Sequence, residues 1–196
     1  AIVTSSYNLS NIFGSQVTKY IIGDNVKGIG DYAFYGCSSL ISVTIPNSVT
    51  SIGSNVFNGC SSLTSLIIGE GVTTVANEAF KGCSSLTTVV WNAKNATNIS
   101  ITNDKVFIDA TSTITSFVFG ENVEYIPNYL CGGLSKITFI TIPKSVTNVG
   151  AYAFNGCTAL KYLTNFSDNE EINTSNVTDM SYMFYICSEL NVVEGV

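Results

Sequence analysis

The sequence predicts an α/β repeat solenoid of about seven stacked coils, which together form a single domain over residues 1–196. The first observation is a motif, Gly-Cys-Ser-Ser-Leu, which occurs at 36–40, 59–63 and 82–86, with a looser copy at 156–160. The second is the regular return of the apolar residue that ends each unit, at spacings of 23, 23, 28, 23, 23 and 30 residues. Internal repeats of this length indicate stacked units rather than a conventional globular core. The residues that end the units are Leu40, Leu63, Leu86, Ile114, Ile137, Leu160 and Leu190.

The third observation is that seven apolar positions recur within each unit. In the unit 41–63 they are Val43, Ile45, Val49, Ile52, Phe57, Cys60 and Leu63, and the units 64–86 and 138–160 fill the same columns with apolar residues. One unit buries too little apolar surface to offset the conformational entropy lost on ordering it. Contacts with neighbouring units must stabilise it, as they do in a solenoid.

Each regular unit contains three predicted elements. Ser42–Ile45 alternates polar and apolar residues, which indicates a short half-buried strand. Turn residues follow at 46–48, and 49–53 reads as a second, shorter extended piece. Ser54–Cys60 is too short for an independent helix and is predicted to form one helical or 3₁₀ turn.

Not every part of the chain follows the regular unit. Residues 1–16 read as a degenerate N-terminal coil or cap, 17–160 as regular coils and 161–196 as a variant C-terminal coil. Among the regular coils, the one at 87–114 is irregular, because it carries five extra residues and lacks the cysteine. No polar cap is evident after Leu190, so further coils are expected to follow in the natural protein.

The recurring cysteine is predicted to be a buried free thiol. In the fifth coil Cys131 occupies the phenylalanine column and Leu134 the cysteine column, while Thr111 is expected to fill that column in the fourth coil. A column that accepts leucine serves packing, and a buried free cysteine behaves as a small apolar residue. Disulfides are the closer alternative, but side chains stacked in one column point the same way rather than towards each other. The predicted ladder consists of Cys37, Cys60, Cys83, Cys157 and Cys187.

Composition excludes several classes of function. A net charge of −6 with only eight Lys and Arg argues against nucleic acid as a partner. The longest apolar runs are far too short for insertion into a membrane. The sequence has no histidine, which removes Ser-His-Asp and Cys-His catalysis and every histidine-containing metal site. We therefore expect a non-enzymatic protein without cofactor or metal. The polar residues are mostly Ser, Thr and Asn, a balance commoner outside the cell.

The repeat pattern of 40–63, with its Ile-Pro, Ile-Gly, Phe and Cys positions, resembles the BspA-like leucine-rich repeats of microbial surface proteins. The segment 173–190, Asn-Thr-Ser-Asn-Val-Thr-Asp-Met-Ser-Tyr-Met-Phe onward, resembles a sister repeat found in the same class of proteins. The resemblance implies a right-handed solenoid with a parallel sheet on its concave side. It also implies secretion or attachment to a cell surface, and a role in adhesion or in binding an extracellular ligand.

Two outward-facing columns of the predicted sheet suggest where such a ligand binds. The first column holds small polar residues in most coils and then two aromatic ones, Phe139 and Tyr162. Rigid exposed aromatic side chains are typical of binding surfaces. We predict these two as anchors, with Val118, Thr141 and Thr164 around them, for a host or extracellular-matrix protein or a glycan. The alternatives are that the aromatics only cover the end of the sheet, or that the solenoid is a structural spacer with no ligand.

The remaining polar clusters carry weaker hypotheses. Asp24 and Glu70 share a turn column with Glu121 and lie two coils apart, about 10 Å, which leaves an acid-pair glycoside hydrolase as a remote alternative. A solvated edge is favoured, because both carboxyl groups are expected to lie on exposed turns. The segment 167–171 holds three acids but lacks the spacing of a calcium loop, so a charged loop is favoured. Trp91, in a buried strand column, is predicted to be core.

Overall fold

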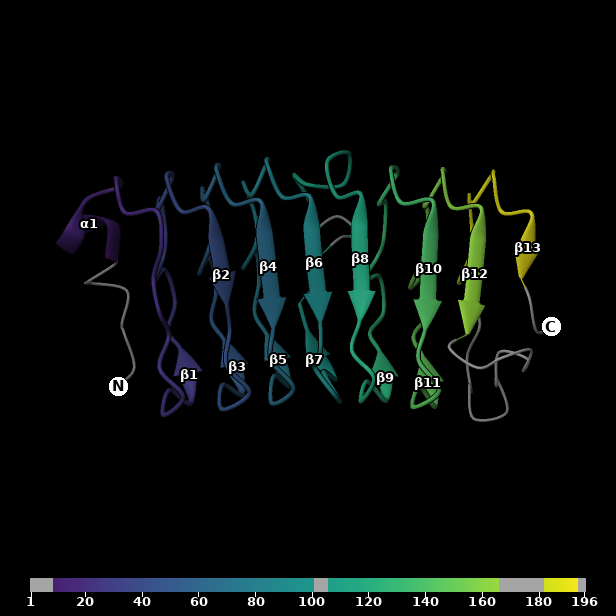
Figure 1. Cartoon of the computed structure of the whole chain (residues 1–196), viewed down its shortest axis with the longest axis horizontal. Helices are drawn as coiled ribbons and strands as arrows, with labels where there is room; N and C mark the ends of the chain where they lie inside the picture. Colours follow the sequence, from purple (N-terminus) through teal and green to yellow (C-terminus); the bar gives the residue numbers. More distant parts are fainter. Residues whose placement is uncertain (1–8, 101–105, 166–181, 194–196) are drawn as a thin grey trace.

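Two rows of parallel strands run along the molecule, within the part of the chain that this computed structural model describes, which is residues 9–100, 106–165 and 182–193. The strands of the first row lie side by side and form what is here called the long-strand face (Figure 1). This row consists of β2 (Ser42–Thr44), β4 (Ser65–Ile68), β6 (Thr88–Trp91), β8 (Ser116–Phe119), β10 (Phe139–Ile142), β12 (Tyr162–Asn165) and β13 (Val192–Val193). The second row consists of β1 (Gly28–Ile29), β3 (Ser51–Ile52), β5 (Thr74–Val75), β7 (Asn98–Ile99), β9 (Tyr125–Ile126) and β11 (Asn148–Val149).

These rows confirm the predicted solenoid with a parallel sheet along one side. The coils wind in a right-handed sense from the N-terminal helix α1 (Leu9–Phe13) to β13 (Figure 1). The second-row strands mark six turns within the described residues, close to the predicted count of about seven coils. Within each sheet a strand pairs with the strand one coil further on, for example Ser65 with Thr88 and Leu66 with Val89. Residues one repeat apart therefore stack directly on one another.

The segment after each second-row strand differs in detail from the predicted helical turn. In the coil 41–63 it is a series of tight turns, in which the backbone N–H of Asn58 donates to the oxygen of Asn55 and that of Cys60 to the oxygen of Phe57. Asn55 (φ 55°) and Gly59 (φ 78°) both have left-handed backbone conformations. A right-handed helix cannot continue through such residues. Within the described residues α1 is therefore the only helix.

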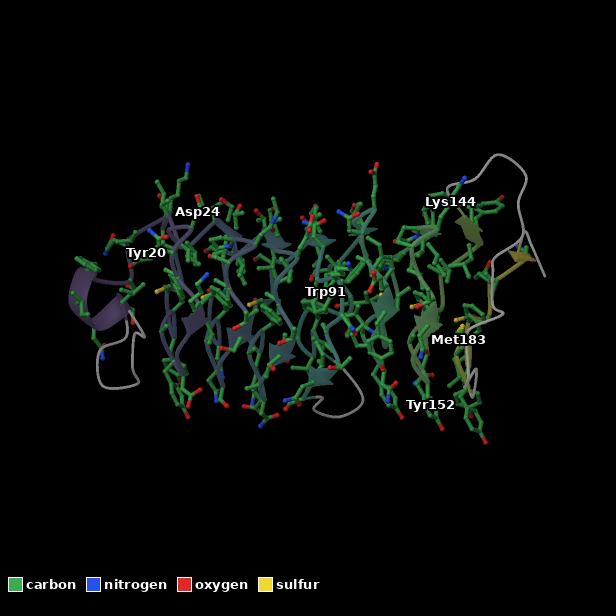
Figure 2. All side chains as sticks on the ribbon, turned by 90° about the horizontal axis from the view of Figure 1, so that it is seen from below. Tyr20, Asp24, Trp91, Lys144, Tyr152 and Met183 are labelled. Carbon is green, nitrogen blue, oxygen red and sulfur yellow. The ribbon has the colours of Figure 1, made fainter. Side chains whose placement is uncertain are left out.

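Stacked aromatic rings fill the interior of the first coils. Phe34, Phe57, Phe80 and Phe107 form a continuous stack with ring centroids 5.0, 5.8 and 5.2 Å apart. Trp91 is fully buried, which confirms its predicted place in the core, and Figure 2 shows it between the two sides of the solenoid. The rings contribute both buried area and favourable stacking between coils.

The irregular fourth coil corrects one prediction. Ala110, not Thr111, occupies the cysteine position there, because Ala110 is fully buried and its carbonyl oxygen accepts the N–H of Ile114. In the regular coils the cysteine carbonyl oxygen accepts the equivalent bond, as from Leu63 to Cys60. Alignment backwards from Ile114 without a gap selects Thr111, since one of the extra residues of this coil lies between Ala110 and Ile114.

Candidate functional site

The predicted anchors lie side by side on the long-strand face. Phe139 of β10 is paired in register with Tyr162 of β12, and half of each side chain is exposed to solvent. Thr141 and Thr164 form the next outward pair, with hydroxyl oxygens 3.5 Å apart. Alternation along the strands explains this orientation, because the intervening side chains face the core. The structure thus brings these four residues into one patch, and their role in binding stays a prediction.

Val118 faces this patch from β8, but the sheet is interrupted between them. Strand β8 is hydrogen-bonded to β6 and strand β10 to β12. No backbone hydrogen bond joins β8 to β10, both of which lie wholly within the described residues. Figure 1 shows these two strands set further apart than their neighbours. Each therefore presents an edge of N–H and C=O groups without a strand partner.

A hollow of about 240 Å³ lies at this interruption, here called the β8–β10 gap. Its lining combines small hydroxyl side chains with apolar ones, and it includes three of the five predicted site residues. The lining residues are Thr115, Ser116, Phe117, Val118, Phe119, Thr138, Phe139 and Thr141. The gap can therefore offer a ligand apolar contacts and hydrogen bonds together.

Packing under β8 accompanies the interruption. Cys131 takes the phenylalanine column in this coil, so the ring stack ends at Phe107. Phe117 and Phe119, at strand positions that hold aliphatic residues in most coils, fill the interior instead, and Phe117 makes an edge contact of 6.0 Å with Phe107. The sequence analysis did not predict the gap. The sequence does contain one sign of it: the small residue Cys131 stands in the phenylalanine column of the same coil in which the strand positions 117 and 119 hold the large residue phenylalanine.

The second row of strands is also displaced near this region. Strand β7 pairs with β5, whereas β9 pairs with β11 and makes only a single bridge, from Tyr125 to Asn95, towards the preceding coil. The backbone N–H of Glu124 donates to the oxygen of Lys94, which lies four residues before Asn98, where the β7 pairing begins. The fifth coil therefore bonds to residues 94–95 of the fourth coil rather than to β7, so the second-row ladder is displaced at this point.

Positive charge gathers around the patch. The segment 125–165 contains Lys136, Lys144 and Lys161 and no Asp or Glu, so it carries +3 in a chain whose net charge is −6. All three lysines are exposed, and neither ion pair found among the described residues involves them. The backbone N–H of Lys161 donates to the oxygen of Thr138, which lines the β8–β10 gap. Figure 2 shows Lys144 at the outer edge of the long-strand side.

The cysteines of the predicted ladder lie in one column, and all are free thiols. Cys187 is partly exposed and the other four are buried. The Sγ of Cys60 donates to the oxygen of Phe34 at 3.2 Å, and that of Cys83 to the oxygen of Phe57 at 3.3 Å. Burial raises the pKa of Cys83 to about 12 and raises that of Cys60 further. A thiol held neutral in this way is a poor nucleophile and a poor metal ligand.

The acid pair weighed as a hydrolase site is not brought into a common cleft. Asp24 lines a hollow at the first coils together with Lys19 and Ser42, whereas Glu70 does not line it. Glu70 is exposed, and its Oε1 accepts a hydrogen bond from Asn122 at 3.2 Å. The acidic segment 167–171 lies outside the described residues. No cluster of metal-ligating side chains occurs among the residues that are described.

A second aromatic surface lies on the opposite side of the solenoid. The rings of Tyr129, Tyr152 and Tyr182 stack with centroids 4.7 and 5.0 Å apart and nearly parallel planes. Figure 2 shows Tyr152 projecting away from the side that carries Lys144. Each of the three has a left-handed backbone, with φ of 56°, 59° and 53°. The sequence analysis missed this stack, although tyrosine recurs there at spacings of 23 and 30 residues.

Comparison with known proteins places this geometry in a family. The family model for the BspA type leucine rich repeat region matches in six copies over residues 9–132 and 100–194. No helix in the described parts of the chain is both long and apolar enough to cross a membrane. No curated protein sequence matches the chain significantly.

Solved structures also resemble the solenoid. A leucine-rich repeat protein from T. pallidum is 25% identical with a TM-score of 0.58, and the match covers 86% of this chain and 73% of that one. A leucine-rich repeat protein from Eubacterium ventriosum is 29% identical with a TM-score of 0.57, over 78% of this chain and 40% of that one. The repeats, the stacked parallel strands and these matches lead to one conclusion: the chain belongs to the BspA-type leucine-rich repeat family.

Proposed function

We propose that this chain is an extracellular recognition module, which binds a protein or glycan of a host or of the extracellular matrix through its long-strand face. The observation that carries the proposal is the exposure of three apolar side chains on this face, Phe139 and Tyr162 of the patch and Val118 across the β8–β10 gap. These side chains are 50%, 50% and 46% exposed on a rigid sheet whose other outward positions are mostly small or polar.

The physical argument concerns the cost of binding. The sheet holds Phe139 and Tyr162 in fixed positions one coil apart, so little side-chain entropy is lost when a ligand covers them. Aromatic side chains bury a large area with few rotatable bonds, which is why they dominate many interfaces. Thr141 and Thr164 add hydroxyl groups beside the rings, and these can donate to or accept from a polar ligand.

A surface-binding screen tests the proposal. The purified chain would be presented to extracellular-matrix proteins and to an array of host glycans, next to the double variant Phe139→Ser/Tyr162→Ser. We expect at least one ligand whose binding the variant loses by roughly tenfold or more, as for the removal of two interface anchors.

The control variant is Ile21→Ser/Ile41→Ser, which removes two exposed apolar side chains from the first coils. It should bind as the unaltered chain does. If the control loses binding equally, the site lies elsewhere on the solenoid. If the folded chain binds nothing in the screen, the proposal fails and a structural spacer without a ligand becomes the better account.

A further inference from the structure

We infer that Asn58 and Asn155 are sites of spontaneous deamidation, a covalent change that the next coil prevents until it separates, and that Asn155 is the first of the two to react. The inference concerns the lifetime of the folded chain and does not depend on the proposed recognition function. Both residues lie in the same tetrapeptide, Phe-Asn-Gly-Cys, at 57–60 and at 154–157. Because their sequence neighbours are identical, a difference in reactivity between the two sites must come from the fold.

The reaction requires a free backbone nitrogen. The nitrogen of the glycine loses its proton and attacks Cγ of the preceding asparagine, so that a C–N bond forms, the side-chain nitrogen leaves as ammonia and a cyclic succinimide remains. Water then adds to either carbonyl carbon of the ring, breaks its bond to nitrogen and yields aspartate or isoaspartate. Glycine hinders this attack least because it has no Cβ, and asparagine is among the thermolabile residues of proteins.

In the folded chain a carbonyl oxygen of the next coil engages each of these nitrogens. The backbone N–H of Gly59 donates to the oxygen of Lys81 at 3.0 Å, and that of Gly156 donates to the oxygen of Tyr185 at 2.8 Å. A nitrogen whose proton is held in such a bond is a poor nucleophile, and breaking the bond inside the stack costs free energy. Each asparagine can therefore react only when the coil that follows it separates.

The two asparagine side chains are restrained differently. Nδ2 of Asn58 donates to Oδ1 of Asn55 at 2.7 Å, which holds Cγ of Asn58 in place. Oδ1 of Asn155 is buried and has no hydrogen-bond partner in the described part of the chain. Less therefore opposes the movement of the Asn155 side chain towards the nitrogen of Gly156.

The coils that cover the two sites also differ in how firmly they are held. Strand β4, in the coil that covers Asn58, pairs with β6 over four residues, whereas β13, in the last coil, pairs with β12 over two. Three apolar columns are fully buried in the first of these coils and partly buried in the last, at Phe80, Cys83 and Leu86 against Phe184, Cys187 and Leu190. Segments with fewer buried contacts open locally at a lower free energy. The last coil therefore uncovers Asn155 before Asn58 is uncovered.

Either product prevents the last coil from closing again. Isoaspartate carries the main chain through the former side-chain carbonyl, which adds one backbone carbon before Gly156 and removes the register between its N–H and the oxygen of Tyr185. Aspartate places a carboxylate where Oδ1 of Asn155 is buried without a donor, and burying an unpaired charge is costly. A transient opening of the last coil is thus converted into a permanent one.

The test follows both asparagines in one sample. The whole chain would be incubated in mildly alkaline buffer and digested, and the peptides that contain each site would be quantified by mass spectrometry. In chain unfolded by urea the two sites should react at equal rates. In the folded chain we expect Asn155 to react at least about tenfold more slowly than in the unfolded chain, and Asn58 at least about tenfold more slowly than Asn155.

Two matched variants identify the coil that protects Asn155. Phe184→Ala removes the ring of the last coil that stacks on Phe154 at 5.7 Å, and it should raise the rate at Asn155 by about tenfold without changing the rate at Asn58. Phe34→Ala removes the ring that stacks on Phe57 at 5.0 Å from the preceding coil, and it should change neither rate, because the partner of Gly59 lies in the following coil.

Hydrogen exchange of the peptide that contains Gly156 measures the opening itself. Urea below the unfolding transition repeats the test on the unaltered chain, and decides the matter if Phe184→Ala does not fold. It should raise the rate at Asn155 at a lower urea concentration than the rate at Asn58. The inference would be overturned by equal rates at the two sites in the folded chain, by a faster reaction at Asn58, or by an unchanged rate at Asn155 when hydrogen exchange shows that the last coil has opened.

Discussion

The N-terminal coils, residues 17–86, and the C-terminal coils, residues 115–160, are built on the same apolar columns but carry different surfaces. In the first group a stack of phenylalanine rings runs through the interior and the long-strand face shows mostly small or polar residues. In the second group the interior stack is broken at Cys131, and aromatic rings appear on both outer sides. In the second group the acidic residues Glu121 and Glu124 come first, and the charged residues after them are the lysines Lys136 and Lys144.

This comparison shows that the inward and outward columns of a repeat are under different physical constraints. The inward columns must be filled in every coil, because each coil is stabilised by its neighbours. The outward columns have no such requirement, so one group of coils can provide a regular scaffold and the other a binding surface. The irregular coil 87–114 lies between the two groups.

The prediction with the largest expected effect compares the two ring stacks. The buried phenylalanine stack should stabilise the N-terminal coils more than the exposed tyrosine stack stabilises the C-terminal ones. Phe80→Ala should lower the free energy of unfolding by about 3–5 kcal/mol, because it leaves a cavity between Phe57 and Phe107. Tyr152→Ala should cost only about 1 kcal/mol, since that ring is partly exposed. Urea unfolding measures both, and equal losses would contradict the distinction.

The second prediction concerns alkaline pH. The folded state raises the pKa of Cys83 from 9.0 to about 12 by burial, so it favours the neutral thiol. Between pH 9 and 12 the thiol is deprotonated in the unfolded chain but still protonated in the folded one. The free energy of unfolding that the protonated thiol contributes is therefore fully present below pH 9 and is lost as the pH rises from 9 towards 12. Cys83→Ala should therefore reduce the fall in unfolding free energy between pH 8 and pH 10 by about 1 kcal/mol.

Cys187, in the C-terminal coil, provides the matched comparison for that measurement. Burial also raises the pKa of its thiol, but the residue is partly exposed. Cys187→Ala should therefore change the dependence on pH less than Cys83→Ala does. The opposite order, from urea titrations at each pH, would show that depth of burial does not control the shift.

The third prediction concerns backbone strain in the last coil. Ile186 has φ of 60° at the position where the other coils with this motif have a left-handed glycine, such as Gly82 and Gly156. A β-branched residue is strained in this conformation. Ile186→Gly should raise the free energy of unfolding by roughly 0.5–1 kcal/mol, after the entropic cost of glycine.

Gly82→Ala is the control for this prediction, because it introduces the strain that Ile186→Gly removes. Its Cβ would also lie 2.9 Å from the backbone nitrogen of Gly59. Thermal or urea unfolding should show opposite signs for the two substitutions. Destabilisation by Ile186→Gly would mean that its side chain makes compensating contacts.

The smallest expected effect lies at the junction between the two groups of coils. Lys94 Nζ is 3.0 Å from Glu124 Oε1, and about half of each side chain is exposed. An exposed ion pair contributes little, so Lys94→Met should change the free energy of unfolding by only about 0.2–1 kcal/mol. The difference should disappear in 1 M salt. A larger or salt-independent loss would indicate that the shifted ladder at Lys94 matters more than its charge.

Much of the fold was predictable because the inward columns repeat in the sequence itself. Residues such as Val43, Phe57 and Leu63 recur at a fixed spacing, and alternation along a strand then fixes which neighbours face outward. The exposure of Phe139 and Tyr162 follows from the same two rules, which is why their positions could be read before the structure was known.

The remaining features depend on how neighbouring coils fit together. The β8–β10 gap accompanies a redistribution of volume between Cys131, Phe117 and Phe119, and no column taken alone contains that information. The shift from Thr111 to Ala110 depends on where the extra residues of the fourth coil are accommodated. The tyrosine stack depends on left-handed backbone conformations at Tyr129, Tyr152 and Tyr182. Such conformations are expected from sequence mainly at glycine, so a tyrosine gives no sign of them.

The interrupted ladder also has a mechanical consequence. A pulling force along the solenoid axis separates one coil from the next, and the hydrogen bonds between coils resist it. Between β8 and β10 this resistance is left to the β9–β11 pair, the neighbouring turns and the core. Under tension the rod would therefore part first at this junction.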